Sequence, residues 1–379
     1  MDRSFARIDA YLDAERPGTP CIIVDLELVR AHYRTLRSLM PRVDIFYAVK
    51  ANPAAAVLQA LAELGASFDL ASRGEIERCC ALGVPVQRFS FGNTIKRESD
   101  IAMARTAGID LFAFDCEAEL RKLARAAPGA RVFARLSVHG GGADWPLTRK
   151  FGCDAETAGE LLVLARSLGL RPAGVSFHVG SQQTDPARWA MPIARAAAVF
   201  HRCAHQRIDL ELLNLGGGLP AFGYRESVPP LSEYVETMEM ALGKHFGSAR
   251  PRILIEPGRY MVADAGLLRA EILLIADRHR NSHRWVYLDA GRYNGLAETQ
   301  GERIRYRLRT RRDGSREGSI ILAGPTCDST DIIYERSHYT LPLDLDVGDC
   351  VDFLSAGAYT ASYASVEFNG FLPIAMHYI

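Results

Sequence analysis

The chain has 379 residues, 48% of them hydrophobic and 24% charged, and its formal net charge is zero. A balanced charge excludes the strongly basic surface that binds nucleic acid and the excess charge of a disordered chain. No apolar run is long enough to span a membrane, and residues 1–16 lack the apolar core of a signal peptide. We therefore expect a cytoplasmic protein whose partners include neither nucleic acid nor a membrane.

The eight cysteines form no CxxC pair and no cysteine–histidine cluster at metal-ligand spacing. In a chain of this length without a secretion signal, this usage predicts free thiols and no metal site. Cys327 is the one thiol that the motifs below assign to chemistry.

Strand and helix patterns alternate regularly between residues 45 and 256. Short apolar runs predict strands at 45–49, 67–70, 88–91, 111–114, 131–136, 172–177, 211–215 and 252–256. Helical periods follow at 54–64, 73–82, 97–107, 117–126, 155–168, 186–205 and 231–245. Eight such strands, alternating with helices over about 250 residues, predict a parallel (β/α)8 barrel. A doubly wound open sheet is the alternative, but that fold does not need eight units.

The pattern changes after residue 259. Long helical periods end, and β-type segments follow at 267–276, 285–289, 320–323, 350–354 and 365–369. We therefore predict an α/β chain with a barrel domain at 26–262 and a C-terminal β domain at 263–379. Residues 1–25 contain a further strand candidate, at 19–25, that can join the β domain.

Lys50 stands where the first barrel strand ends, in the stretch FYAVKAN. Asn52 and Pro53 predict a helix N-cap and a first-turn proline, which places Lys50 between a strand and a helix. Active sites of such barrels lie at the carboxyl ends of the strands. The other strand ends carry a set of glycines and polar or reactive groups: Asp69, Asn93, Asp115, Arg135, His178, Gly216 to Gly218, Glu256 and Arg259. A barrel without a catalytic function would need only small turn residues at these points, so this set of side chains predicts an active site.

The loops after the seventh and eighth strands predict a phosphate site. Successive glycines at 216–218 let backbone N–H groups approach an anion, and Arg259 can clamp a phosphate with two hydrogen bonds. Ser181 can add a hydroxyl to the same phosphate. Each feature also has a simpler interpretation: the glycines as a turn, and Arg259 as the internal ion-pair partner of Glu256.

Pyridoxal phosphate accounts for these groups together. The cofactor needs a lysine for its covalent linkage, an anion site for its phosphate and an acid opposite its ring nitrogen. Lys50 and Glu256 are the lysine and the acid that the strand ends offer, and His178 can stack on the ring. A single histidine at a strand end is equally explained by packing, so His178 is assigned only as a member of the set.

The chain also resembles a known family over nearly its whole length. The stretches that carry the resemblance are, in chain order, FYAVKAN, FDLAS, FHVGS, GGG, EPGRY, GPTCDSTD, GAYT and FNGF. They are similar to motifs of the fold-type III pyridoxal phosphate decarboxylases, especially ornithine decarboxylase and its bacterial ornithine/lysine relatives. The resemblance implies a homodimer whose active sites are shared between subunits.

The resemblance also implies roles for individual residues. Lys50 would carry the cofactor, Glu256 would pair with the ring nitrogen and His178 would stack on the ring. The positions that match phosphate-binding residues or polar neighbours of the cofactor are Asp69, Arg135, Ser181, Gly217, Gly218, Gly258, Arg259 and Tyr359. Across the dimer interface, Cys327 would protonate the carbanion after carbon dioxide leaves, and Asp328 would bind the distal ammonium of the substrate.

Three segments depart from the family pattern. Residues 140–149 form a long glycine-rich stretch, which predicts a loop near the mouth of the site. Smaller or apolar residues are expected where the chain has Arg292, Tyr293 and Asn294. Glu302 stands where an acidic pair is expected. We expect Tyr293 and Glu302 to contact the substrate, and these changes can shift the preference among basic amino acids.

We predict decarboxylation of a basic L-amino acid: first L-ornithine to putrescine in polyamine biosynthesis, and second L-lysine to cadaverine. Diaminopimelate decarboxylase is the nearest alternative, but the distal carboxylate of its substrate needs a cation where this chain offers Asp328. A decarboxylase of a related unusual diamino acid is a further alternative. An inactive regulatory homologue would be expected to have lost Lys50 or Cys327, and both are present.

Overall fold

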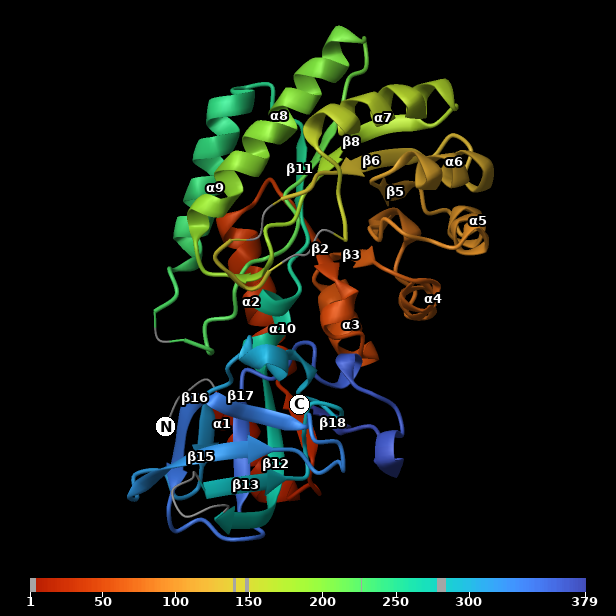
Figure 1. The fold of residues 1–379 in the computed structure, drawn as a ribbon. Helices are drawn as coiled ribbons and strands as arrows, with labels where there is room; N and C mark the ends of the chain where they lie inside the picture. The colour runs from red at the N-terminus through yellow and green to blue at the C-terminus, as the bar shows by residue number, and fades with distance from the viewer. Residues whose placement is uncertain (1–4, 139–140, 147–149, 226, 278–283) are drawn as a thin grey trace. The chain divides into compact units, whose positions relative to one another are not determined.

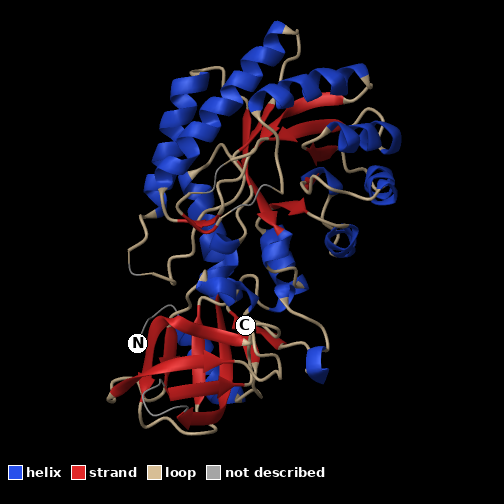
Figure 2. Ribbon diagram, in the orientation of Figure 1, coloured by secondary structure: helices blue, strands red, loops and turns tan. Residues whose placement is uncertain are grey.

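The computed structural model of the chain describes residues 5–138, 141–146, 150–225, 227–277 and 284–379. The chain forms two compact units (Figures 1 and 2). The barrel unit comprises Arg30–Pro220 and Val228–Gly258, and the β unit comprises Met1–Val29, Ala221–Ser227 and Arg259–Ile379. The units thus divide after Gly258, four residues before the predicted boundary at 262.

The barrel unit confirms the predicted (β/α)8 fold. Eight parallel strands close into a barrel in the order β10-β11-β2-β3-β4-β5-β6-β8. Their bounds are β2 (Asp44–Ala48), β3 (Ser67–Leu70), β4 (Phe89–Phe91), β5 (Leu111–Phe114), β6 (Arg131–Arg135), β8 (Arg171–Ser176), β10 (Leu212–Asn214) and β11 (Arg252–Ile255). Side chains from six strands form one buried cluster: Phe46, Leu111, Ala113, Phe133, Ala173, Leu212 and Leu254. Such a shared core favours closure of the sheet, because it joins strands that are distant around the ring.

Helices lie outside the barrel strands (Figure 1). Their bounds are α2 (Leu26–Leu39), α3 (Ala55–Glu63), α4 (Arg73–Ala81), α5 (Glu98–Thr106), α6 (Glu117–Ala126), α7 (Ala155–Ser167), α8 (Ala190–His205) and α9 (Leu231–Phe246). Helix α4 begins at a side-chain cap, since the Ser72 hydroxyl accepts the Glu75 N–H at 3.3 Å. Such caps position the loops that lead away from the strand ends.

The start of α3 differs from the prediction. Asn52 does not cap the helix, because a 3-10 turn (Val49–Ala51) follows β2 and leaves Asn52 in an extended conformation. The Asn52 side chain accepts the Ala54 N–H at 3.2 Å in a local turn, and α3 begins only at Ala55. Lys50 therefore lies in a short turn of its own, between a strand and a helix.

Part of the predicted 140–149 loop is a strand. Residues 143–145 form β7 (Ala143–Trp145), which pairs antiparallel with β9 (Ser181–Gln183). Gly140 and residues 147–149 lie outside the described residues. The pairing places Ser181 at the start of a strand rather than in a free loop.

The β unit contains an eight-stranded sheet that is coloured red in Figure 2. Six strands follow the order β14-β17-β12-β13-β15-β16, and β1 pairs with both β12 and β18. The bounds are β1 (Cys21–Val24), β12 (Gly266–Asp277), β13 (Arg284–Leu288), β14 (Leu308–Thr310), β15 (Glu317–Ala323), β16 (Ile332–Pro342), β17 (Cys350–Leu354) and β18 (Ala375–Tyr378). Strand β1 thus belongs to the same sheet as the C-terminal strands.

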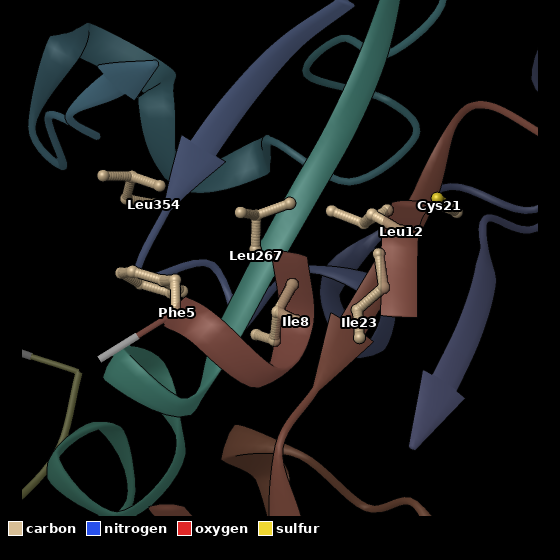
Figure 3. Packing of buried hydrophobic residues seen from close by; sticks show 7 residues of the cluster. All are labelled: Phe5, Ile8, Leu12, Cys21, Ile23, Leu267 and Leu354. Carbon is tan, nitrogen blue, oxygen red and sulfur yellow. The ribbon is translucent and has the colours of Figure 1, made fainter. Parts of the chain in front are cut away.

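Helix α1 (Ala6–Glu15) was not predicted. Its apolar side chains Phe5, Ile8 and Leu12 recur at helical spacing and pack against Cys21, Ile23, Leu267 and Leu354 (Figure 3). A single apolar stripe on a ten-residue helix gains stability mainly by burial against the sheet.

The strand predicted at 365–369 is wrong. A 3-10 turn, Phe368–Gly370, takes its place, and Glu367 and Asn369 have left-handed φ values of 59° and 52°. A strand cannot continue through positive φ angles. The stretch is therefore a turn-rich surface segment.

Candidate active site

The carboxyl ends of the barrel strands bring Lys50, Asp69, Arg135, His178 and Glu256 into one cluster of interacting charges. A hydrogen bond across the turn helps to hold Lys50 at this place: the Tyr47 hydroxyl donates to the Asn52 carbonyl at 3.0 Å. The end of β2 is also tied to the loop after β11 by a hydrogen bond from the Ala48 N–H to the Pro257 carbonyl, at 3.1 Å. The predicted convergence of these five side chains is thus observed.

Two of these groups are carboxyls whose pKa values are raised by burial. Asp69 is 6% exposed and accepts a hydrogen bond from Ser90 at 3.1 Å. For Glu256, burial and the neighbouring Asp69 raise the pKa to about 7, against a hydrogen bond from Asn214 that lowers it. A carboxyl group with a pKa near 7 can share a proton with a pyridine nitrogen.

The two basic partners have lowered pKa values. Burial lowers the pKa of Arg135, whose guanidinium carbon lies 5.0 Å from the centre of the Phe151 ring. Burial and the charges of Arg135 and Lys50 lower the pKa of His178 well below 6.5. The Gly180 N–H donates to His178 Nδ1 at 3.0 Å, which assigns the proton of the neutral ring to Nε2. A neutral ring held in this way is suited to stacking on a flat cofactor.

The glycine loop after β10 is a close-packed backbone cradle. A Cβ atom on Gly217 would lie 2.5 Å from the Glu256 carbonyl and 3.0 Å from His178 Nε2. Gly218 has φ +115°, and a Cβ atom there would lie 2.6 Å from the Gly180 carbonyl. The Gln183 N–H donates to the Gly218 carbonyl at 3.0 Å, which brings the β9 strand that begins at Ser181 beside the loop. Only glycines leave room here, as an anion-binding backbone requires.

Arg259 lies in the β unit and forms a buried ion pair. Its guanidinium donates to both Glu298 oxygens, at 2.7 and 2.6 Å, and lies 4.8 Å from the centre of the Tyr359 ring. The simpler interpretation had paired Arg259 with Glu256, but the observed partner is Glu298. Burial opposes the charge, yet the Glu298 carboxylate raises the pKa of Arg259 well above its usual value. Tyr359 has φ 54°, a conformation that non-glycine residues rarely adopt and that clusters at functional sites.

Cys327 and Asp328 lie in one loop of the β unit. The Cys327 N–H donates to Asn369 Oδ1 at 3.0 Å. Asp328 Oδ1 accepts two hydrogen bonds from Thr330, from its N–H at 2.8 Å and from its hydroxyl at 2.6 Å. The Tyr293 hydroxyl lies 2.8 Å from the Thr330 hydroxyl, so Tyr293 belongs to the same group.

Glu302, which we expected to contact the substrate, contacts the backbone of strand β16 in this structure. Its carboxylate is 7% exposed and accepts the N–H groups of Glu335, Arg336 and Ser337, at 2.9, 2.7 and 2.6 Å, and also the Ser337 hydroxyl. Burial would raise the pKa of Glu302, but these hydrogen bonds lower it to about 2. Glu302 therefore anchors strand β16, and both of its oxygens are used there.

Three residues beside these groups were not predicted. Asn214 holds Glu256 and could have been found, because it is a polar residue near the end of a predicted strand, two positions before the first glycine. Glu298 and Thr330 carry no comparable signal. Their partners Arg259 and Tyr293 lie 39 and 37 residues away, so only the folded chain shows the contacts.

The described residues include no cluster of three or more His, Cys, Asp or Glu side chains that could hold a metal ion. Within those same ranges, no helix combines the length and the apolar character needed to cross a membrane.

The chain is similar to proteins of one family. The family profile described as "Pyridoxal-dependent decarboxylase, pyridoxal binding domain" matches residues 26–263. Ornithine decarboxylase of Mus musculus is 35% identical over 375 residues, which cover 94% of this chain and 80% of that protein. Antizyme inhibitor 2 of Xenopus laevis is also 35% identical, over 371 residues, with the same coverage.

A solved structure of the same family is similar over its whole length. The lysine/ornithine decarboxylase of Vibrio vulnificus, complexed with cadaverine, matches with a TM-score of 0.89 and 32% identity, covering 100% of this chain and 99% of that one. A relative named as an enzyme and one named as an inhibitor are equally similar to this chain in sequence. The residues of the site, rather than overall similarity, must decide between the two.

Proposed function

The chain belongs to the pyridoxal-dependent decarboxylases, and on this premise we propose that it decarboxylates a basic L-amino acid, first L-ornithine and second L-lysine. Pyridoxal phosphate is the cofactor of this family, and when bound it supplies an electron-accepting ring. One observation carries the proposal: a half-buried acid, Glu256, whose pKa is raised to about 7, interacts with the strand-end Lys50. An inactive homologue would have no need of this pair.

In the barrel unit we assign five residues to the cofactor. Lys50 forms the covalent linkage, and Glu256 holds a proton at the ring nitrogen, which increases the electron demand of the ring. His178 packs against the ring face, and its neutral state avoids repulsion from a protonated ring. Asp69 and Arg135 set the charge balance around Lys50 and Glu256, as their mutual effects on the pKa values support.

For the phosphate we assign, in the barrel unit, the backbone N–H groups of Gly217 and Gly218, the Ser181 hydroxyl and Gly258. Arg259 and Tyr359 belong to the β unit and are assigned by their motifs alone. The glycine cradle, which has no room for a Cβ atom, supports the first part. Arg259 already neutralises Glu298, so it offers the phosphate less charge than a free guanidinium. The backbone N–H groups must therefore supply a larger share of the phosphate binding.

We further propose a homodimer in which Cys327 and Asp328 complete the site of the partner subunit. Cys327 delivers a proton to the substrate carbon after carbon dioxide leaves, and Asp328 binds the distal ammonium, with Tyr293 beside it. An exposed apolar patch next to this loop supports the interface: Tyr363, Val366, Phe368, Phe371 and Leu372 are between 37% and 80% exposed. Asn369 links the patch to Cys327, and large exposed apolar patches mark interaction sites.

We propose that the reaction takes place in the cytoplasm and supplies a diamine for polyamine synthesis. All eight cysteines are free, which suits a reducing compartment. The product follows from the substrate, because removing the carboxyl group of ornithine or lysine leaves a chain with an amine at each end.

Carbon dioxide release from the cofactor-saturated protein tests the function. The panel comprises L-ornithine, L-lysine, L-arginine and meso-diaminopimelate. We expect release from ornithine, with lysine second. Release from diaminopimelate alone would contradict the role of Asp328, because a distal carboxylate would be repelled by it. No release from any substrate, with cofactor bound, would contradict the proposed activity as a whole.

A further inference from the structure

Asp328 belongs to a chain of three side chains in the β unit. We propose that the Thr330 hydroxyl, held by Tyr293, is a positioning and specificity-determining group that fixes the Asp328 carboxylate and thereby selects the length of the substrate. This inference rests on the proposed function, because it concerns how the distal ammonium is bound. It assigns Tyr293 an action through Thr330 rather than on the substrate directly.

The direction of the hydrogen bonds follows from the number of protons. Thr330 has one hydroxyl proton, and at 2.6 Å it is donated to Asp328 Oδ1. The Tyr293 hydroxyl, 2.8 Å from the Thr330 oxygen, must then be the donor in that contact. Both groups thus point toward the carboxylate, and hydrogen bonds from Thr330 and, to a smaller extent, from Tyr293 lower the pKa of Asp328. With Oδ1 held in this way, we assign Oδ2 to the distal ammonium.

Thr330 cannot simply follow the carboxylate, because its backbone is anchored. The Arg292 guanidinium donates to the Thr330 carbonyl at 2.8 Å, and the Arg292 N–H donates to Asp331 Oδ1 at 2.8 Å. Asp331 is 3% exposed and also accepts the Thr326 hydroxyl at 2.7 Å. The loop that carries Asp328 is therefore closed on itself by the contact between Thr326 and Asp331, and its Thr330–Asp331 end is attached to the segment that carries Arg292.

A fixed carboxylate discriminates between substrates of different length. Ornithine and lysine differ by one methylene group, so their ammonium groups end at different depths when the other end of each substrate is held in the same place. Without the Thr330 hydroxyl, the Asp328 carboxylate keeps only the hydrogen bond from the Thr330 N–H at 2.8 Å, and it can turn about that one contact to meet either ammonium. One methylene is worth roughly 10- to 200-fold in specificity in a well-defined pocket, and this ratio should fall when the carboxylate is released.

The test compares T330V with T330S in the cofactor-loaded enzyme. Valine keeps the shape of threonine without the hydroxyl, and serine keeps the hydroxyl without the methyl group. We expect T330V to raise KM for the preferred substrate about 10-fold with kcat within about twofold, because a binding contact is lost. The ratio of kcat/KM between ornithine and lysine should move toward one. T330S should keep the wild-type KM and ratio.

Tyr293→Phe provides the second variant. Because Tyr293 acts on Asp328 mainly through Thr330, Y293F should raise KM alone and add less in T330V than in the wild type, so the double-mutant cycle shows coupling. Additive effects of the two substitutions, or a T330V enzyme with unchanged KM and substrate ratio, would overturn the inference. The inference can fail in this way only if the wild-type enzyme releases carbon dioxide from ornithine or lysine. A wild-type enzyme that is inactive on both substrates would contradict the proposed function instead.

Discussion

Individual residues of the site owe their properties to the place where their strands end. Lys50 and Glu256 are ordinary ionisable side chains in sequence, but the closed barrel brings them into one group of interacting charges. Burial raises the pKa of the acid, and the neighbouring Lys50 and Arg135 hold it partly in check. The chemistry of the site is therefore a property of the group, and each member can be tested alone.

Replacing Lys50 with Ala should abolish the covalent attachment of the cofactor. Reduction with borohydride followed by mass spectrometry should find an adduct on Lys50 in the wild type and none in the variant. Lys96 serves as an internal control, because this buried lysine donates to the Asn93 and Ala113 carbonyls at 2.7 Å and should carry no adduct. If the variant carried as much adduct as the wild type carries on Lys50, another lysine would hold the cofactor.

Glu256→Gln should change how the stability of the cofactor-free protein depends on pH. The pKa of Glu256 is raised from 4.5 to about 7, so the folded state keeps a proton that the unfolded state releases. This stabilisation is complete below about pH 4.5 and is lost as the pH rises through 7. Between pH 5.5 and 8, the free energy of unfolding should fall by about 1–3 kcal/mol more in the wild type than in the variant.

Urea unfolding at the two pH values measures this difference. The variant remains neutral at both, so it reports the pH dependence of all other groups. Parallel pH profiles for the two proteins would mean that Glu256 titrates at its ordinary pKa, which would remove the main observation behind the proposed function.

Among the elements, the loops and turns of the β unit do more for the proposed chemistry than its strands. The loop with Cys327 and Asp328 joins β15 to β16, and Glu302 anchors β16 just beyond it. The carboxylate that was expected to bind substrate instead satisfies three backbone N–H groups where the pairing of β15 and β16 is irregular. A strand irregularity of this kind leaves donors that a side chain must satisfy.

Glu302→Gln should destabilise the protein without a direct effect on substrate binding. The amide loses the charge that these donors favour, at a cost of about 1–3 kcal/mol in the free energy of unfolding at pH 7. The pKa of Glu302 is lowered from 4.5 to about 2, so its stabilisation is present above pH 4.5 and is lost as the pH falls through 2. Urea unfolding at pH 7 measures the cost. Glu335→Gln is the matched control, because its side chain is exposed on the same strand.

If E302Q instead raised KM for ornithine and left the free energy of unfolding unchanged, Glu302 would have to contact the substrate. The expected result is the reverse, with lower stability and an unchanged KM.

At the scale of the whole molecule, the two halves of each active site in the proposed homodimer come from different subunits. Lys50 lies in the barrel unit and Asp328 in the β unit of the same chain. The exposed apolar patch around Phe368 and Leu372 is the surface that a second copy would cover. Complementary halves that meet across a two-fold axis form two equal sites per dimer.

Mixing two inactive variants tests this arrangement. K50A and D328A each lose both sites as homodimers, but a heterodimer has one site with an intact lysine and an intact aspartate. Unfolding and refolding an equal mixture makes half of the dimers mixed, so about a quarter of wild-type activity should return. Subunits with self-contained sites would recover nothing, and that result would refute the shared site.

The sequence by itself determined the barrel and supplied the candidate residues at its strand ends. Strand and helix periods are local, and the rule that sites lie at strand ends converts those periods into a list of residues that includes Lys50 and Glu256. Motif resemblance added Cys327 and Asp328, which no period could identify. Helix α1 was missed although its apolar spacing was visible, and the strand at 365–369 was predicted where positive φ angles forbid one.

Only the tertiary structure decided which polar group meets which. Arg259 pairs with Glu298, Glu302 binds the backbone of β16, and Thr330 links Tyr293 to Asp328. Each contact joins residues between 2 and 39 positions apart, and most of them have no periodic signature. A hydrogen bond depends on distances of a few tenths of an ångström, which local preferences do not set. The fold thus follows from patterns along the chain, whereas the charges and contacts of the site follow from how the folded segments meet.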